Sequence, residues 1–599
     1  MTFHSLVELI AYRALRDREK LYVSSPDSRV DLTYGLFYRQ AQKFARHLQG
    51  YGLPKGARVA LSLNNGLGWL TAFWGVLLAG GSVVPLNPRL KPQETAGLLA
   101  QAGVRMIIAD TEGQGSLPPE QFACRAGSCP VEMEGQEELH LFLRPGRAAG
   151  EAAGTADRPA EAEALLLFTS GSTGEPKGVA LTHGNLLAEA GFIQQGHNLT
   201  GADIVLCILP FFHINGLVIT LITPVLTGSR AVVPRKFSAK RFWTWIDRYQ
   251  VTWFSAVPTI LSILLSQKGE VAASSLRFVR SASASLPVVI LEEFERRFGV
   301  PVIESYGISE AGSQVATNPL PPAVRKAGSV GLPVGNELLI VDESGQAVPA
   351  GVAGEVIIRG PNVTKGYHNN AAANRESFKD DWFYTGDLGF FDQEGYLFLT
   401  GRRKELINRA GEKISPREVD EILYRLPAVE TAAAVGVPDR LFGEEIVAFI
   451  QLRPGSELNG EQVLAHCRAL LADFKVPKQI FFITSFPKGA SGKIQRLRLV
   501  ELYHDLTVMA ERSTGRMTNE PVTSGKYNVR LDEQACKGCG YCAEVCPREV
   551  FGRADYFNGK GYRPAQVKAA GKCVGCRRCF FLCPDFAIDV EEKREEDEP

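Results

Sequence analysis

Eight of the twelve cysteines lie between Cys536 and Cys583, and they form two runs with the same spacing. Each run reads Cys-x2-Cys-x2-Cys-x3-Cys-Pro. Closely spaced thiols in a large chain indicate metal ligation, whereas in a small secreted protein they would indicate disulfides. Four thiolates can hold zinc as well as an iron–sulfur cluster, so the pattern of the two runs has to decide between these metals.

The doubled run, with a proline after each last cysteine, favours iron–sulfur clusters over zinc. It resembles the bacterial ferredoxins that carry two [4Fe–4S] clusters, in which three cysteines of a run bind one cluster and the fourth binds the other. This resemblance implies two ligand sets. They are Cys536, Cys539, Cys542 and Cys583 for the first cluster, and Cys573, Cys576, Cys579 and Cys546 for the second.

A second stretch suited to chemistry is Thr-Ser-Gly-Ser-Thr-Gly-Glu-Pro-Lys-Gly, residues 169–178, which follows the apolar run 165–168. Its glycines allow tight turns, and its hydroxyls and backbone N–H groups can donate to phosphate oxygens. Lys177 adds a compact positive charge. The Gly-Lys-Ser/Thr order of a Walker A loop is absent. Composition alone therefore leaves two interpretations, a phosphate-binding loop and a flexible Ser/Gly loop.

Five further motifs follow this loop and decide between the two interpretations. In order they are Leu-Pro-Phe-Phe-His-Ile-Asn-Gly at 209–216, Glu-Ser-Tyr-Gly-Ile-Ser-Glu at 304–310, Tyr-Thr-Gly-Asp at 384–387, Gly-Arg-Arg-Lys-Glu at 401–405 and Pro-Lys-Gly-Ala-Ser-Gly-Lys at 487–493. The series closely resembles the acyl- and aryl-CoA ligases of the adenylate-forming superfamily, and the resemblance covers about residues 10 to 505.

The chemistry of these ligases explains the motifs. A carboxylate is a poor acyl donor, so ATP first converts it to an acyl-adenylate, and the thiol of CoA then displaces AMP. The first barrier is largely electrostatic, because a carboxylate must attack the polyanionic triphosphate. Positioned positive charges and dipoles lower that barrier. The resemblance therefore implies that ATP, Mg²⁺, CoA and a carboxylic acid bind to this chain.

The resemblance also implies a role for each residue of the nucleotide site. The phosphate loop would comprise Thr169, Ser170, Gly171, Ser172, Thr173, Gly174 and Lys177, with Ser170, Thr173 and Lys177 on the β- and γ-phosphates. Tyr306 and Gly307 would border the adenine, next to Ser309, where the family usually has threonine. Glu310 would ligate Mg²⁺, which prefers carboxylate and phosphate oxygens. Asp387 and Arg402 would hold the ribose; taken alone, Asp387 is equally well read as a turn residue.

The remaining motif residues belong to the transition state and to the second half-reaction. Lys493 would enter the site from the small domain and stabilise the transition state electrostatically. His213 would lie beside the path of the acyl group and the pantetheine, although a core histidine explains its aromatic flanks equally well. Lys404 would mark the hinge about which the small domain rotates between the half-reactions. Gly411 would then let the thiol arm of CoA approach closely.

Within the superfamily the chain most resembles the oxalate–CoA ligase group, through five strings that lie between residues 281 and 409. They are Ser-Ala-Ser-Ala-Ser-Leu at 281–286, Thr-Asn-Pro-Leu-Pro at 317–321, Gly-Ser-Val-Gly at 328–331, Arg-Gly-Pro-Asn-Val-Thr-Lys-Gly-Tyr at 359–367 and Lys-Glu-Leu-Ile-Asn-Arg at 404–409. Oxalate enzymes carry a histidine where this chain has Ser313. Losing a cationic donor near a dianion weakens its binding, so the predicted substrate is a small or medium carboxylic acid.

Strand-like and helix-like stretches alternate through the first 400 residues and predict an α/β fold with partly parallel sheets. Strands are expected at 59–63, 82–85 and 105–109, and a helix is expected at 34–48. The expected organisation is a large adenylate-forming domain at 1–400, a small mobile α+β domain at 401–511, a linker at 512–527, a ferredoxin-type α+β domain at 528–590 and an acidic tail at 591–599.

Composition limits the environment and the partners of the chain. Sixty-six basic residues balance 66 acidic ones, so no nucleic-acid binding is expected. The first twenty residues lack the apolar core of a signal peptide, and the longest apolar stretches are too short to span a membrane. We therefore expect a soluble, cytoplasmic protein.

An insert between the two cysteine runs, Phe-Asn-Gly-Lys-Gly-Tyr-Arg-Pro at 557–564, contains an Asn-Gly hairpin signal. It resembles the insert in the small ferredoxin-like subunit of 2-oxoacid:ferredoxin oxidoreductases. That resemblance implies thiamine-dependent oxidoreductase subunits as partners. Two alternatives stay open: an adenylating enzyme that loads a carrier-protein thiol, and an electron-transfer subunit with an inactive ligase scaffold.

Overall fold

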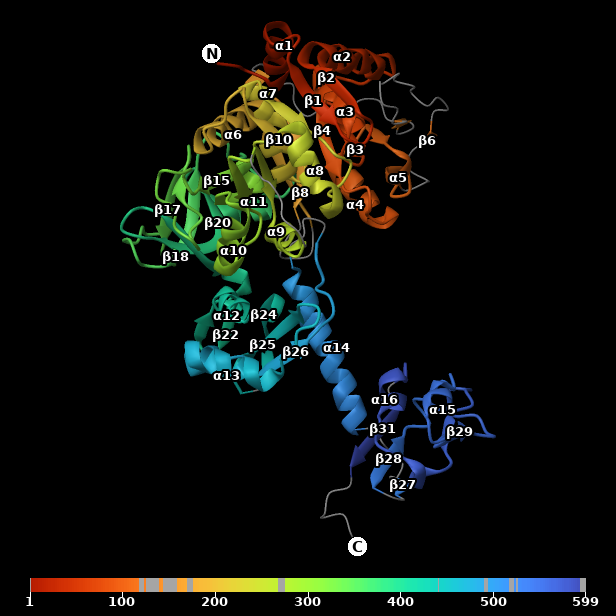
Figure 1. The fold of residues 1–599 in the computed structure, drawn as a ribbon. Helices are drawn as coiled ribbons and strands as arrows, with labels where there is room; N and C mark the ends of the chain where they lie inside the picture. Colours follow the sequence, from red (N-terminus) through yellow and green to blue (C-terminus); the bar gives the residue numbers. More distant parts are fainter. Residues whose placement is uncertain are drawn as a thin grey trace. The chain divides into compact units, whose positions relative to one another are not determined.

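The computed structural model of the chain folds into two compact units, Met1–Arg496 and Leu497–Pro599. The structure describes residues 2–117, 123–124, 139–143, 159–169, 176–267, 275–439, 441–489, 494–515, 522–523, 526–585 and 587–592. Figure 1 shows the elements of both units in chain order.

Three β-sheets form the framework of residues 1–402, as the alternation of strands and helices predicted. The first has nine strands in the order β16-β15-β14-β13-β12-β10-β11-β1-β2, and its central strands run parallel. Its strands are β1 Leu21–Ser25, β2 Val30–Thr33, β10 Ile204–Leu206, β11 Arg230–Val232, β12 Trp253–Ala256, β13 Phe278–Ser281, β14 Val302–Ile308, β15 Ser313–Thr317 and β16 Leu332–Pro333.

The second sheet has seven strands in the order β6-β7-β5-β3-β4-β8-β9, with β3, β4, β5 and β8 parallel. Its strands are β3 Arg58–Ser62, β4 Ser82–Leu86, β5 Met106–Ala109, β6 Ala123–Cys124, β7 His140–Leu143, β8 Glu163–Thr169 and β9 Lys177–Thr182. The third sheet is antiparallel, with β17 Glu337–Val341, β18 Gly354–Arg359, β19 Phe378–Lys379, β20 Trp382–Phe391 and β21 Leu397–Arg402.

Helices cover these sheets and bury their apolar faces. They are α1 Leu6–Arg16, α2 Tyr34–Gly50, α3 Leu67–Leu78, α4 Pro92–Ala102, α5 Thr111–Gln114, α6 His183–Gly196, α7 Thr223–Thr227, α8 Ala239–Tyr249, α9 Pro258–Leu265, α10 Val288–Phe298 and α11 Ala371–Ser377. The apolar α3 is buried over almost its whole length, and α2 packs on it. The structure thus confirms strands and a helix where the sequence predicted them, with shifts of one or two residues at the ends.

Residues 407–496 fold around a core of their own. Its sheet contains β22 Ile407–Arg409, β23 Glu412–Ile414, β24 Val429–Asp439, β25 Gly443–Leu452 and β26 Gln479–Phe482. The helices are α12 Pro416–Tyr424, α13 Gly460–Leu470 and α14 Arg496–Gly515, so α14 reaches into the stretch expected as a linker. Ion pairs between Lys413 and Glu343 and between Arg496 and Glu405 are among the contacts within the first unit.

The second unit begins at Leu497 and therefore contains α14 after its first residue. Its described part from residue 522 to 592, which we call the cysteine module, is built from short elements. They are β27 Val522–Thr523, β28 Tyr527–Leu531, α15 Tyr541–Val545, β29 Phe551–Arg553, β30 Ala565–Val567, α16 Arg578–Leu582 and β31 Ile588–Glu592. The turn in its insert differs from a two-residue Asn-Gly hairpin. The Asn558 N–H donates to the Tyr562 carbonyl, and the Asn558 side chain donates to the Glu533 and Cys536 carbonyls, so this asparagine fixes a longer loop.

Among the helices in the described part of the chain, none combines the length and the apolar character that crossing a membrane requires. The acidic tail from residue 593 onward and residues 516–521 and 524–525 of the expected linker lie outside the described residues.

Candidate active site and cluster-binding site

Three of the segments singled out in the sequence lie at one edge of the nine-stranded sheet. β10, β12, β13 and β14 run parallel, so their carboxyl ends meet there. The His213 segment follows β10, the serine-rich stretch 282–285 follows β13, and Glu310 follows β14. Ligands of α/β sheets bind outside the carboxyl ends of the strands, so this edge is the expected place for the acyl and adenylate groups.

The two ends of the phosphate loop are held by an antiparallel pair of strands. Thr169 at the end of β8 pairs with Lys177 at the start of β9, and the Thr169 hydroxyl donates to the Lys177 carbonyl at 3.4 Å. The loop residues between them, Ser170, Gly171, Ser172, Thr173 and Gly174, lie outside the described residues. The Lys177 ammonium lies 4.7 Å from the centre of the Tyr367 ring.

Tyr367 connects this lysine to the predicted magnesium ligand. Its hydroxyl donates to Glu310 Oε1 at 2.8 Å, and the Glu310 carbonyl accepts the Thr364 N–H at 2.7 Å. Burial, and then the charge of Glu310, raise the pKa of the Tyr367 phenol well above its ordinary value. The phenol therefore stays a donor, and it holds the carboxylate next to the base of the phosphate loop.

A second group of contacts centres on Asp387, whose side chain is only 7% exposed. The Tyr306 hydroxyl donates to Oδ2 at 2.6 Å, and Arg402 Nε donates to Oδ1 at 2.8 Å. The register of β20 on β21 places Asp387 opposite Arg402. Asp387, as the leading cause, raises the pKa of Arg402, so the guanidinium is charged at all working pH values. Each carboxylate oxygen keeps a lone pair for another donor, such as a ribose hydroxyl.

The turn between β14 and β15 presents Ser309 and Glu310. Gly307 pairs with Gln314, and a Cβ at Gly307 would lie 1.6 Å from the Ser313 carbonyl oxygen, so only glycine fits there. The chain then turns through the 3₁₀ segment Ser309–Ala311, and Ser313 adopts a φ of 148°. This geometry explains why the motif needs glycine at position 307. It also explains why the Ser309 hydroxyl and the Glu310 carboxylate lie at the tip of the turn.

His213 precedes a π-helix, Asn215–Ile222, every residue of which is buried. The half-buried imidazole packs against Phe212, with ring centres 4.6 Å apart. π-Helical turns are rare and concentrate at functional sites. The family resemblance implied a position for His213 beside the path of the acyl group and the pantetheine. Nothing in the spacing of the residues in that motif predicted a π-helix after it.

The predicted hinge and thiol-arm residues are exposed. Lys404 lies in the 3₁₀ segment Arg403–Glu405, and its ammonium is 3.9 Å from Glu376. Gly411 is in the tight turn between β22 and β23, where it and Ala410 have φ values of 92° and 54°. Lys493 lies outside the described residues; the strand bridge between Lys488 and Ile494 joins the two sides of its loop.

In the cysteine module the structure brings one quartet of thiols to a common cavity. One small hollow is lined by Cys546, Cys573, Cys576 and Cys579, together with Val550, Phe551 and Val590. Burial, and then the neighbouring thiols of Cys546, Cys573 and Cys576, raise the pKa of the Cys579 thiol to about 12. Four thiols around one hollow are the donor set that a cubane cluster requires.

The other four thiols also influence one another. Burial raises the pKa of Cys542 to about 11, and Cys536, Cys539 and Cys583 add to that rise. Backbone N–H groups point at several sulfurs: those of Gly538 and Ala565 donate to Cys536 at 3.3 Å, and that of Ala587 donates to Cys583 at 3.3 Å. Such N–H donors fit sulfur atoms that carry negative charge in a cluster, and they tune its potential.

The residues that sequence reasoning missed lie behind the motifs. They are Arg280, Asn215, Gln314 and Glu189, and all four are buried. An arginine inside the apolar strand Phe-Val-Arg-Ser was a visible signal, because a buried guanidinium requires dedicated partners.

Three family matches cover most of the chain. The AMP-binding enzyme family matches residues 10–368, the AMP-binding enzyme C-terminal domain matches residues 418–493, and the 4Fe-4S dicluster domain matches residues 535–587. Sulfoacetate–CoA ligase from Cupriavidus necator is 40% identical over 501 residues, which span 83% of this chain and 98% of that protein. Oxalate–CoA ligase from Arabidopsis thaliana is 39% identical over 505 residues, 83% and 97% of the two chains.

Solved structures agree with these matches. ATP-bound MatB from Rhodopseudomonas palustris superposes with a TM-score of 0.74 at 27% identity, over 84% of this chain and 99% of that one. The o-succinylbenzoate-CoA synthetase MenE from Bacillus subtilis, in complex with ATP and magnesium, gives a TM-score of 0.70 at 30% identity, over 82% and 98%.

The chain therefore belongs to the AMP-binding enzyme family, as an AMP-forming acid–thiol ligase that also carries a 4Fe-4S domain. This confirms the predicted α/β fold, the ligase class and the ferredoxin-type fusion. Binding of ATP and Mg²⁺ and the use of CoA as a substrate follow from the family.

Proposed function

We propose that this ligase converts a small or medium carboxylic acid into its CoA thioester. A carboxylate oxygen attacks the α-phosphorus of ATP, the bond to pyrophosphate breaks, and an acyl-adenylate forms. The CoA sulfur then attacks the acyl carbon, the bond to AMP breaks, and the thiol proton passes to solvent. Mg²⁺ would neutralise phosphate charge during the first step.

The contacts that link the motif residues carry this proposal. Lys177, Tyr367 and Glu310 form one connected group beside the phosphate loop. Tyr306, Asp387 and Arg402 form another, with its carboxylate positioned for a ribose. Lys177 would bind phosphate oxygens with Ser170 and Thr173, Glu310 would ligate Mg²⁺, and Lys493 would stabilise the transition state.

The relatives support a short acid. The two quoted above are named for sulfoacetate and oxalate, and each of these compounds is short and has two acidic groups. Ser313, the position where oxalate enzymes carry histidine, is buried in β15 and offers a hydroxyl instead of a cation.

A panel of acids tests this function. AMP release that depends on both CoA and the acid is measured with oxalate, malonate, sulfoacetate, acetate, benzoate, octanoate and palmitate. We expect the highest kcat/KM among the acids shorter than octanoate. Preference for palmitate over every short or aromatic acid would refute the proposed substrate class and leave the ligase assignment intact.

For the cysteine module we propose two [4Fe–4S] clusters that relay electrons. Cys536, Cys539, Cys542 and Cys583 would hold one cluster, and Cys573, Cys576, Cys579 and Cys546 would hold the other. The two thiol quartets support this division. Neither half-reaction of the ligase moves electrons, so the clusters serve a redox partner.

We propose thiamine-dependent 2-oxoacid:ferredoxin oxidoreductase subunits as that partner, because their chemistry interconverts acyl-CoA and 2-oxoacids. Exposed apolar side chains close to the ligand cysteines in the sequence support docking. Val574 is 46% exposed, Phe581 73% and Leu582 53%, and each stands within two residues of a ligand cysteine. Large exposed apolar side chains on a small domain are often contact sites for other proteins.

Anaerobic purification of the intact chain from its native cells tests the redox half. Two cubanes predict about eight irons per chain. Co-purification of thiamine diphosphate-binding subunits, and their reduction of the clusters, would support the partner. If such subunits neither bind nor exchange electrons with the chain, an ordinary ferredoxin role for another reductase takes its place. Ligase activity without iron binding would instead refute the clusters.

A further inference from the structure

Behind the active-site edge, the strand β13 carries a buried positive charge on Arg280, which is only 1% exposed. Its hydrogen-bond partners are neutral oxygens. Nη1 donates to Asn215 Oδ1 at 3.0 Å and to Ser255 Oγ at 3.1 Å, and Nε donates to Gln314 Oε1 at 3.3 Å. Burying a guanidinium costs several kcal/mol unless its charge is compensated. The arrangement therefore calls for an explanation beyond packing.

Glu189 is the acidic residue that interacts electrostatically with Arg280, and it compensates the positive charge poorly. Its carboxylate is fully buried and accepts the Gln314 N–H and the Asn362 amide, the latter at 2.8 Å. Burial raises the pKa of Glu189 to about 8, so this carboxyl is largely protonated at neutral pH. Burial lowers the pKa of Arg280 only to about 10, so the guanidinium keeps its charge.

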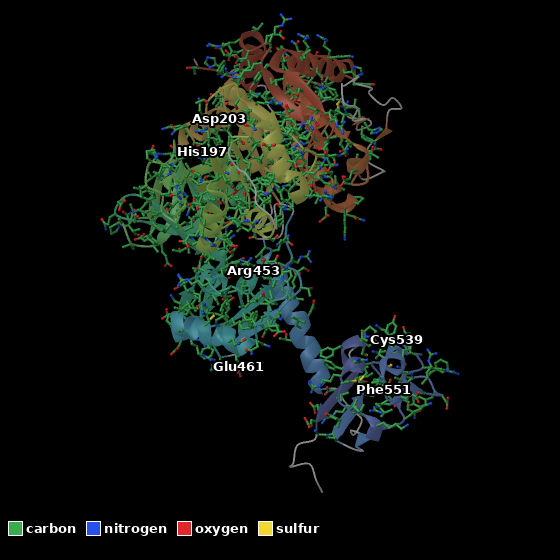
Figure 2. All side chains as sticks on the ribbon, viewed as in Figure 1. His197, Asp203, Arg453, Glu461, Cys539 and Phe551 are labelled. Atoms are coloured by element: carbon green, nitrogen blue, oxygen red, sulfur yellow. The ribbon has the colours of Figure 1, made fainter. Side chains whose placement is uncertain are left out.

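The third titratable member of the cluster is neutral. His197, which Figure 2 labels, follows α6 and stacks on Phe278 with ring centres 5.3 Å apart. Its Nε2 is 2.8 Å from Gln314 Oε1. Burial lowers the pKa of this imidazole to about 3. Burial thus disfavours the charged form of His197 as well as that of Glu189, so neither group fully offsets the charge of Arg280.

Each direct partner of Arg280 also belongs to, or adjoins, a segment at the acyl edge of the sheet. Asn215 begins the π-helix two residues after His213, and its Nδ2 donates to Ser283 Oγ at 3.0 Å. Ser283 follows β13 with a φ of 75°. Gln314 follows Ser313. The guanidinium is therefore linked to the Ser283 hydroxyl through the Asn215 side chain, and its partner Gln314 is the sequence neighbour of Ser313. Its positive field extends toward this edge of the sheet.

We propose that Arg280 forms the positive base of an anion subsite that selects short acids with a second anionic group, a carboxylate or a sulfonate. The electrostatic effect of the Arg280 guanidinium reaches the substrate through the side chains of Asn215, Ser283 and Gln314. These side chains also orient the hydroxyls that face the substrate. Arg280 thereby supplies the charge that Ser313 does not. The proposal rests on the proposed short-acid function and names the feature that selects among such acids.

The test uses the full-length protein with its clusters and measures acid-dependent exchange of pyrophosphate into ATP. Malonate is compared with its monomethyl ester, which has the same carbon chain and one charge fewer, and sulfoacetate tests the sulfonate form. In Arg280→Gln we expect kcat/KM for both dianions to fall about 30- to 100-fold, and that for the monoester to change less than about threefold. Arg280→Lys keeps the charge and should retain most of the dianion preference.

A second variant keeps the inference testable where Arg280→Gln does not fold. Asn215→Asp places a carboxylate on the guanidinium with almost no change of shape, and it should also remove the preference for dianions. Equal losses for dianion and monoester would show that Arg280 only supports the fold. A wild-type preference for monoanionic short acids would overturn the subsite and leave the short-acid function standing, whereas activity on long-chain acids alone would refute that function first.

Discussion

The ligase unit and the cysteine module place their functional residues in opposite ways. In the ligase, the motif residues come from separate segments of three sheets: Lys177 and Glu310 both contact Tyr367, and Asp387 pairs with Arg402. In the module, the eight closely spaced cysteines lie between Cys536 and Cys583, and each proposed quartet takes three cysteines from one run and the fourth from the other.

Their cores differ in the same sense. The main core of the ligase is built from aliphatic and aromatic side chains such as Trp69, Phe73 and Trp74. The core of the module includes Cys536, Cys542, Cys579 and Cys583 themselves. A domain of this size buries little apolar surface, so metal binding supplies part of its folding free energy. In the ligase the fold positions the functional residues, whereas in the cysteine module the bound metal would stabilise the fold.

The largest expected effect follows from that contrast. Replacing one cysteine of each quartet, in Cys542→Ala and Cys579→Ala, should remove a cluster and unfold much of the module, because the core loses the metal that crosslinks it. Iron content should fall from about eight to about four or fewer. Ligase kcat/KM should stay within about twofold of wild type, since neither half-reaction uses electrons.

Iron analysis, visible absorbance and AMP release measure these outcomes on the same samples. Cys467→Ala is the matched control, because Cys467 is a buried cysteine in the core of residues 407–471 and should leave the iron content unchanged. Full iron content in Cys542→Ala, or a parallel collapse of ligase activity, would contradict the separation of the two units.

The second prediction concerns a variant that should impair the ligase reaction and leave the cysteine module unchanged. Lys493→Ala should lower acyl-adenylate formation by about 10²- to 10³-fold, because it removes a positive charge that acts in the transition state. Thioester formation from supplied acyl-adenylate should be nearly unchanged, since the proposed rotation of the small domain would take Lys493 out of the site in that step. Pyrophosphate exchange and thioester formation measure the two steps separately.

Lys488→Ala, in the same loop, is the control for general damage and should change both rates by less than about threefold. If Lys493→Ala slows both half-reactions equally, the lysine is not specific to adenylation. Iron content should equal that of wild type in both variants, which ties this test to the comparison of the two units.

The sequence predicted the motifs but not the contacts that connect them. The order of six motifs was enough for the fold and the ligase class, and the repeated cysteine spacing was enough for the ferredoxin-type domain. Tyr367 was part of a family string, but its hydrogen bond to Glu310 depends on strands far apart in the chain. Sequence analysis assigned no role to Arg280, Asn215 or Gln314. Their surroundings are determined by burial and long-range pairing, which the periodicity of the sequence does not encode.

The smallest expected effect sharpens the role of one such contact. Tyr306→Phe removes the hydroxyl that donates to Asp387 and leaves the ring, so the carboxylate keeps Arg402 but loses one donor. We expect the KM for ATP to rise about 5- to 30-fold with little change in kcat, because a hydroxyl hydrogen bond to a buried carboxylate contributes about 1–2 kcal/mol. Asp387→Asn should raise the KM further, because it removes the acceptor for Arg402 and the ribose together. If Tyr306→Phe matches wild type while Asp387→Asn does not, the tyrosine serves only as a wall of the pocket. If instead kcat falls with an unchanged KM, the pair of Asp387 and Tyr306 acts in the chemical step, and the scattered ligase site depends on its scaffold for catalysis as well as for binding.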